Sequence, residues 1–152
     1  MSTGVAATAA VAARLKTVVG PTANVFDMLG NPTTEAAFKS RYINAEKIHA
    51  YEVTREGSVP DETKSIAVIT RQEKVVIYGY YGFKDGVSEP AFQAEVDAIA
   101  AAFDPPSQRQ FEGAGNEWSS APLVEGPRMG RLGQALVHYV RISITVDFDP
   151  IF

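Results

Sequence analysis

The sequence predicts an α+β fold, in which helices pack on one face of an antiparallel or mixed β-sheet. An amphipathic helix pattern over Ser88–Phe103 directly follows a β-rich run and a Gly-containing turn. A long stretch of alternating apolar and polar residues, Gln134–Phe148, predicts a half-buried antiparallel strand. Helix and strand patterns follow one another with short loops between strands, which favours this class. The chain has 152 residues, which is a typical length for one domain, so we expect a single α+β domain over residues 1–152.

An Ala-rich segment predicts a first helix that runs to about Val18 and ends at Gly20-Pro21. Ser2 and Thr3 can cap it. Its apolar stripe has i, i+4, i+7 spacing and consists of Val11, Leu15 and Val18. The basic residues follow the apolar run, whereas a secretory signal carries them before it, so we interpret the segment as part of the mature protein.

The next part of the chain predicts short elements separated by polar turns. In order, these are a strand over Ala23–Met28, a turn at Gly30-Asn31-Pro32, a helix over Glu35–Arg41, a strand over Ile48–Arg55 and an exposed polar loop over Glu56–Lys64. Thr34 is placed to cap the helix, and Phe38 to anchor it. We expect the polar loop to be mobile in the free protein.

Ser65–Phe83 is the longest β-rich run. Its pattern fits either one long bulged strand or a tight hairpin around Gln72-Glu73. The helix that follows begins with Ser88 as its cap. Its apolar face consists of Phe92, Val96, Ile99 and Phe103, and Asp104-Pro105-Pro106 ends it.

Trp118–Val124 predicts another strand, and the Gly-rich segment Glu125–Gly133 predicts a mobile loop or an irregular edge. In the final strand, the expected buried face consists of Leu136, His138, Val140, Ile142, Ile144, Val146 and Phe148. About 15 residues exceed the usual strand length of roughly five or six. We therefore expect the excess to project past the core or to pair with a neighbouring subunit, which indicates an oligomer.

Charge and composition exclude some classes of protein. The net charge of −4 and the pI of about 5.2 argue against a nucleic-acid-binding surface, which needs clustered Lys and Arg. The absence of cysteine excludes a disulfide framework, a thiolate zinc site and a thiol nucleophile. No apolar run reaches the roughly 18 residues that a membrane span requires, so we expect no membrane partner.

No motif typical of catalysis or metal binding is present. His49 and His138 lack H-x-H or H-x-x-x-H spacing, and we interpret them as hydrogen-bonded histidines at the edge of the core. Gly79–Gly82 (GYYG) lacks the spacing of a phosphate loop. Asp147 and Asp149, with Asp85 and Glu89, are candidates for a carboxylate pair for hydrolysis, but we interpret Asp85 as a turn residue and expect the two later aspartates to lie near a frayed end. We therefore expect no catalytic, cofactor-binding or metal-binding residue.

Contact with a protein partner is the role that remains for several polar and aromatic residues. Mixed charges surround the tyrosines, which favours packing or an interface over single-stranded nucleic acid; the set is Tyr42, Tyr51, Tyr78, Tyr80, Tyr81 and Tyr139. We take four residues as candidate partner-binding residues: Arg128, Met129 and Arg131 in the Gly-rich segment, and Lys84. The alternative for the arginines is a solvated loop.

Four segments of the chain resemble a known family, and they occur in the same order. They are Y-E-V-T-R at Tyr51–Arg55, I-Y-G-Y-Y-G-F-K-D at Ile77–Asp85, S-E-P-A-F-Q-A-E-V-D-A-I at Ser88–Ile99, and the segment from Gly130 that contains L-V-H-Y. Together they look similar to small proteins encoded among the head–tail and tail genes of tailed bacteriophages and gene transfer agents. Within that group, the chain resembles the tail terminator proteins.

The resemblance implies a structural virion protein without an active site or cofactor. Such a protein would form a hexameric ring that caps the tail tube and binds the neck or head-completion protein, while DNA passes through the lumen without specific binding. It would be assembled in the host cytoplasm and located at the tail–neck junction of the virion. The alternatives are another head–tail connector or tail-completion protein, and a small-molecule-binding α+β domain that uses His138 and the tyrosines.

Overall fold

The computed structural model describes residues 4–61, 70–103, 117–118 and 122–148 of the chain. The helices are α1 (Gly4–Val19), α2 (Glu35–Tyr42) and α3 (Ser88–Ala102). The strands are β1 (Asn24–Phe26), β2 (Ile43–Asn44), β3 (Lys47–Asp61), β4 (Thr70–Gly82), β5 (Glu117–Trp118), β6 (Leu123–Leu132) and β7 (Ala135–Phe148). Within these ranges, no helix has the length and apolar character to cross a membrane. The expected cap at Ser2 and Thr3 and the stop at Asp104-Pro105-Pro106 lie outside the described residues.

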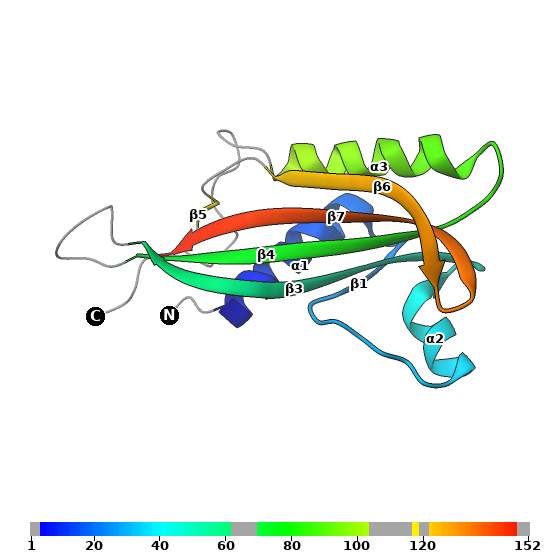
Figure 1. The fold of residues 1–152 in the computed structure, drawn as a ribbon, viewed down its shortest axis with the longest axis horizontal. Coiled ribbons are helices and arrows are strands. Elements are labelled where there is room, and N and C mark those ends of the chain that lie inside the picture. Colours follow the sequence, from blue (N-terminus) through cyan, green and yellow to red (C-terminus); the bar gives the residue numbers. More distant parts are fainter. Residues whose placement is uncertain (1–3, 62–69, 104–116, 119–121, 149–152) are drawn as a thin grey trace.

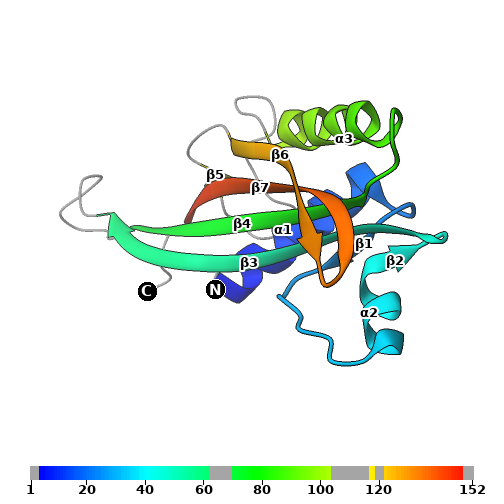
Figure 2. The same ribbon diagram turned by 45° about the vertical axis from the view of Figure 1, so that its right-hand side comes forward.

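The strands form one mixed sheet along the length of the molecule (Figure 1). From one side its order is β1, β3, β4 and β7, and both β5 and β6 pair with the far edge of β7. The short β2 pairs with the beginning of β3, beside α2 (Figure 2). Because β1 is parallel to β3 and the other pairings are antiparallel, the predicted α+β class with a mixed sheet is confirmed.

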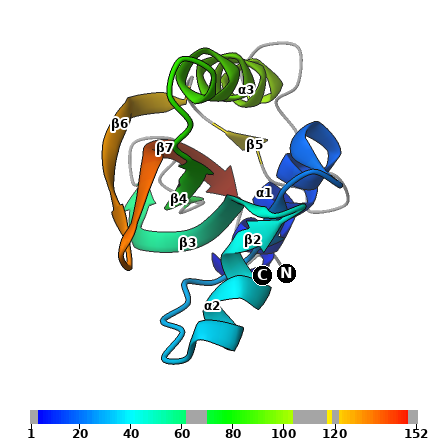
Figure 3. The same ribbon diagram turned by 90° about the vertical axis from the view of Figure 1, so that its right-hand side faces the viewer.

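The main core lies between the sheet and two long helices. The sheet is curved, and α1 and α3 lie on the same side of it (Figure 3). The expected face of α3 is buried: Phe92, Ile99 and Phe103 have no exposed surface, and Val96 is 3% exposed. On α1, Val11 and Leu15 are buried as expected, but Val19 rather than Val18 completes the stripe. Burial of these apolar side chains is the main force that holds both helices on the sheet.

A smaller cluster, on the opposite face, holds α2. Tyr42 on α2 packs with Ile48, Ala50 and Val137 of the sheet, and Phe38 adds partly buried surface as expected. Thr34 caps the helix as predicted, since its hydroxyl accepts a hydrogen bond of 3.1 Å from the Ala37 N–H. Helices therefore cover both faces, although the two long ones share one face.

The segment Glu56–Asp61 is part of β3, so the prediction of a loop beginning at Glu56 was wrong for these residues. After a bulge between Arg55 and Gly57, β3 pairs with β4 as far as Asp61 opposite Thr70. The continuous ladder also decides between the two interpretations of Ser65–Phe83, because Gln72-Glu73 lies inside β4 and not in a turn. Hydrogen bonds to β4 satisfy the backbone here, which outweighs the polar composition of the segment.

The Gly-rich segment is a strand at the edge of the sheet, so the irregular edge is the correct one of the two predicted alternatives and the mobile loop was wrong. β6 pairs with β7 on either side of a register shift between Glu125 and Arg128. Gly126 lies in this bulge with φ of +102°, and Gly133 turns the chain into β7 with φ of +62°. Because glycine adopts positive φ without strain, the residues that suggested irregular structure instead form the bulge and the hairpin turn.

The predicted final strand is confirmed, but its length has an explanation within one chain. β4 pairs with β7 from Val137 to Phe148. On the other edge, β6 covers Ala135 to Ser143, and β5 covers Val146 and Asp147. Both edges of β7 are thus occupied by the same chain, so the length of this strand gives no evidence for an oligomer. From His138 to Val146 the expected face is buried, whereas Leu136 is 39% exposed; the side chain of Phe148 lies outside the described part of the chain.

Candidate functional site

Large apolar side chains are exposed at the end of the sheet where α3 and β7 begin. Phe83 is 40% exposed, Val87 56%, Leu136 39% and Met129 52%. Phe83, Val87 and Leu136 line a cavity of about 520 Å³ together with Ile48, Lys47 and Lys84. We call this cavity the end pocket. A concentration of exposed apolar surface of this kind marks a binding site more often than isolated exposed residues do.

The turn between β4 and α3 positions the rim of the end pocket. β4 ends at Gly82, and the Phe83 N–H then donates a hydrogen bond of 3.2 Å to the Leu136 carbonyl, which holds Phe83 against β7. The Lys84 carbonyl accepts hydrogen bonds from the N–H groups of Val87 and Ser88, at 3.2 and 3.0 Å. This tight turn projects Lys84 and Val87 toward solvent beside Phe83.

Ser88 and His138 lie beneath the rim. The Ser88 Oγ accepts a hydrogen bond of 2.8 Å from the Lys84 N–H and lies 2.8 Å from the His138 Nε2. The prediction that Ser88 caps α3 was therefore wrong: Val87 holds the cap position, and no side chain caps the helix there. The hydroxyl instead ties the turn to β7. Ser88 is only 3% exposed, and it also lines the end pocket.

The Ser88–His138 contact was missed by the sequence analysis because 50 residues separate the partners. Only the pairing of Tyr81 with His138 in the sheet brings the start of α3 next to β7. No local spacing could have indicated this contact.

His49 occupies a second polar cluster beside the end pocket. Its Nε2 lies 2.6 Å from the Glu95 Oε1, and the Tyr51 hydroxyl donates to the same oxygen. Burial, followed by the charge of Glu95, raises the pKa of Tyr51 well above its ordinary value, so this tyrosine stays a proton donor. In the part of the chain that the structure describes, no group of three His, Asp or Glu side chains is arranged to hold a metal ion.

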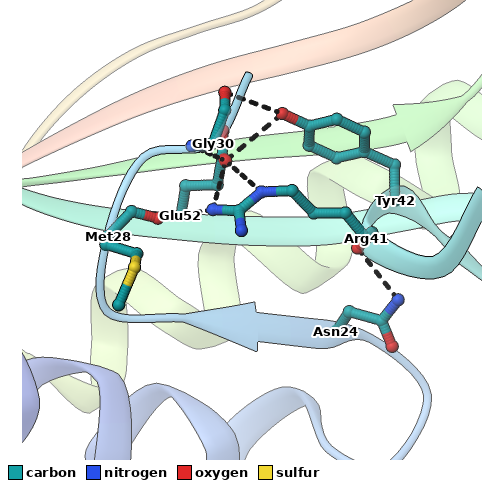
Figure 4. A network of polar contacts seen from close by, with 6 residues as sticks. All are labelled: Asn24, Met28, Gly30, Arg41, Tyr42 and Glu52. Carbon is teal, nitrogen blue, oxygen red and sulfur yellow. Dashed lines mark hydrogen bonds and ion pairs between the residues drawn. The ribbon is translucent and has the colours of Figure 1, made fainter. Parts of the chain in front are cut away.

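A buried ion pair organises the loop before α2 (Figure 4). Glu52 is 2% exposed, and its Oε2 accepts hydrogen bonds from the Arg41 Nε at 2.7 Å and the Gly30 N–H at 2.8 Å. The Arg41 Nη2 lies 2.6 Å from the same oxygen and donates to the Met28 carbonyl. These bonds hold the loop against β3 and form one wall of a second cavity, of about 380 Å³, lined also by Tyr78 and Tyr80.

A surface network on the same face links β3, β4, β6 and β7. Tyr78 donates a hydrogen bond of 2.7 Å to Glu56, and Arg141 pairs with both Glu56 and Glu125, at 2.5 and 2.6 Å. The hydrogen bond from Tyr78, with the charge of Arg141, holds the pKa of Glu56 below its ordinary value. Through Arg141 the network crosses the sheet and joins Glu56 and Glu125, which lie at the bulges of β3 and β6.

The structure brings together three of the four residues expected to bind a partner. Lys84 lines the end pocket. Met129 lies opposite His138 in the β6–β7 pair, and Arg131 lies opposite Leu136, so both side chains share the face of the pocket. Arg128 lies opposite Tyr139 and therefore points to the other face. Successive side chains of a strand point to opposite faces of the sheet, so two arginines three residues apart lie on different faces. A loop would not separate them in this way.

Comparisons with known proteins identify no family. No protein-family model and no curated protein sequence matches the chain. Among solved structures, one similar chain comes from the virion of a native gene transfer agent (GTA) particle, with a TM-score of 0.47 and 13% identity over 94% of each chain. At this level, the likeness decides neither family nor function.

Proposed function

We propose that this chain is a structural virion protein, a tail terminator, that forms a hexameric ring on the end of the tail tube and joins it to the neck or head-completion protein. The observation that carries the proposal is the resemblance of four sequence segments, read together with their places in the fold. They lie in β3, in β4 and the following turn, in α3, and in the β6–β7 hairpin. These elements are neighbours around the main core, and they supply the rim residues Phe83, Lys84 and Leu136.

The arrangement suits a protein that joins other proteins. A rigid body, held by a buried core, presents the exposed apolar side chains of the end pocket next to lysines. Burial of apolar surface drives association, and charges at the rim select the partner. We assign no catalytic, cofactor-binding or metal-binding residue. The net charge of −4 is consistent with a lumen through which DNA passes without specific binding, since phosphate contacts need Lys and Arg.

The proposal is tested by mixing the purified protein with isolated tail tubes and imaging the tube ends by electron microscopy. We expect a ring of six subunits at one end of each tube, and attachment of the neck or head-completion protein only to capped tubes. Tubes incubated without the protein are the control. Absence of density at the tube ends, or a stoichiometry that cannot close a ring, would refute the proposal.

The end pocket also favours a second candidate, a small-molecule-binding domain. Its volume of about 520 Å³ lies within the range of ligand pockets, roughly 300–1,000 Å³. A thermal-shift screen of apolar organic anions separates the two functions: a ligand that raises the melting temperature in wild type but not in a Val87→Glu variant supports this candidate. Attachment to the neck protein without any binding to the tube would instead indicate another head–tail connector.

A further inference from the structure

We propose that the end pocket of one subunit binds the segment Asp149–Phe152 of a neighbouring subunit. The inference rests on the proposed ring and adds the contact between its subunits. It starts from the free edges of the sheet, because strand addition is the simplest way for copies of a β-protein to join.

The free edges are poorly suited to strand addition. Among the described strands, none pairs with the outer edge of β3 beyond Glu52 or with the outer edge of β6. β3 carries a bulge after Arg55 and a proline at Pro60, and β6 carries a bulge that contains Pro127. Bulges and prolines are the features that keep edge strands from pairing with other chains. The apolar end pocket is therefore the better surface for contact between subunits.

The chemistry of the end pocket selects an apolar segment that carries an acidic residue. Its charged lining consists of Lys47, Lys84 and Glu46, which leaves one net positive charge. The Lys47 Nζ lies 2.9 Å from the Tyr81 hydroxyl, at the wall of the cavity. The apolar part of the lining includes Phe83 and Val87, so it can cover one or two large side chains.

A matching segment directly follows β7. Its sequence is Asp149-Pro150-Ile151-Phe152, a carboxylate two residues before a pair of large apolar side chains. Proline holds the residue before it in an extended conformation, which reduces the entropy lost on binding. Asp149 would pair with Lys84 or Lys47, and Ile151 and Phe152 would enter the cavity.

The segment cannot reach the end pocket of its own chain. β7 begins at Ala135, one residue before Leu136 of the end pocket, and ends at Phe148. Figure 1 shows that β7 runs along most of the length of the sheet. Twelve strand residues extend over roughly 40 Å, whereas four residues span at most about 14 Å. Binding must therefore join two subunits.

The contact is head-to-tail, because it uses two different surfaces at opposite ends of the subunit. Repeated contacts of this type close into a ring when the rotation between subunits permits, and otherwise give a filament. The tail tube would supply the template that selects the ring.

The first test measures binding of a fluorescein-labelled peptide of residues 146–152, Val-Asp-Phe-Asp-Pro-Ile-Phe, to the full chain by fluorescence anisotropy. We expect saturable binding with a Kd on the order of 100 μM, as is usual for a short flexible segment. Peptides with Asp149→Asn, or with Ile151→Ser and Phe152→Ser, should bind at least about tenfold more weakly. Val87→Glu in the protein should have the same effect, whereas Leu123→Glu, at a residue of similar exposure outside the pocket, should leave the affinity unchanged.

The second test places Ile151→Ser and Phe152→Ser in the full chain and repeats the imaging of tail tubes. We expect this variant to form no closed ring. If wild type and variant cap tubes equally well and the peptide does not bind, the inference is overturned while the proposed function stands. If wild type fails to cap tubes but the peptide binds in the end pocket, the proposed function fails while the contact is supported. Equal peptide affinity for the Val87→Glu and Leu123→Glu proteins would place the binding site elsewhere.

Discussion

Replacement of Glu52 by Gln is expected to be among the most destabilising single changes of a polar residue in this protein. Glu52 is 2% exposed. Its Oε2 accepts hydrogen bonds from the Arg41 Nε and the Gly30 N–H, and the Arg41 Nη2 lies beside the same oxygen. Gln keeps the size of the side chain and removes the charge. The guanidinium, whose side chain is only 17% exposed, then loses its counter-ion in a place that water reaches poorly.

The expected loss is about 3 kcal/mol in the free energy of unfolding. Removal of one partner from a buried ion pair costs roughly 3–5 kcal/mol. The lower end applies because Arg41 keeps its bond to the Met28 carbonyl and Gln can still accept one hydrogen bond. For a domain of 152 residues, each kcal/mol corresponds to about 2–4 °C in Tm, so the melting temperature should fall by about 6–12 °C.

Urea unfolding at pH 7, followed by circular dichroism, measures this loss. Glu35→Gln is the matched control, because Glu35 pairs with Lys39 at 3.1 Å on the exposed surface of α2 and should change stability by less than about 0.5 kcal/mol. In a double-mutant cycle with Arg41→Met, the two losses should fail to add by about 1–3 kcal/mol. A loss below about 1 kcal/mol for Glu52→Gln, or strict additivity in the cycle, would show that the pair contributes little to the fold.

Three further predictions concern the core, the surface network and the partner-binding face. Phe92→Ala should lower the free energy of unfolding by about 3–5 kcal/mol, because the side chain is fully buried; an unchanged urea midpoint would show that the face of α3 is not packed as described. Glu56 has a folded-state pKa below its ordinary value of 4.5, so its stabilising effect is present above about pH 4.5 and is lost as the pH falls through the folded-state pKa. The difference in Tm between wild type and Glu56→Gln should therefore shrink between pH 7 and pH 3, and a constant difference contradicts the assignment. Arg131→Glu, on the face of the end pocket, should weaken capping of tail tubes, whereas Arg128→Glu, on the other face of β6, should not; equal effects on capped tube ends counted by electron microscopy would exclude the end-pocket face as the contact surface.

The type of most long elements could be read from the sequence, because it depends on local periodicity. One face of the predicted helix repeats apolar residues at the spacing of an amphipathic helix that packs on a sheet. The four residues of this face are all buried: Phe92, Val96, Ile99 and Phe103. The alternation in Gln134–Phe148 likewise determined a strand with one buried face. The cap at Thr34 followed from its hydroxyl and its position before a helix.

Pairing between distant segments could not be read in this way. Two segments have loop-like composition and yet are strands: Glu56–Asp61 and Glu125–Leu132. Each pairs with the edge of β4 or β7, whose backbone N–H and C=O groups would otherwise lack a hydrogen-bond partner in the sheet. The glycines of β6 indicated irregular backbone correctly, but only the register with β7 decided that they form a bulge and a turn.

The candidate site was likewise decided by tertiary structure. Lys84 and Met129 were both selected from the sequence as candidate partner-binding residues; Lys84 lines the end pocket, and the pairing of β6 with β7 places Met129 opposite His138. The contact of Ser88 with His138, the end pocket and the buried pair of Glu52 with Arg41 each join segments that are distant along the chain. The sequence by itself determined which segments are helices and which long strands are half buried, because propensity and periodicity act over a few residues. The tertiary structure decided which side chains meet, because register, bulges and sheet order depend on the packing of the whole chain.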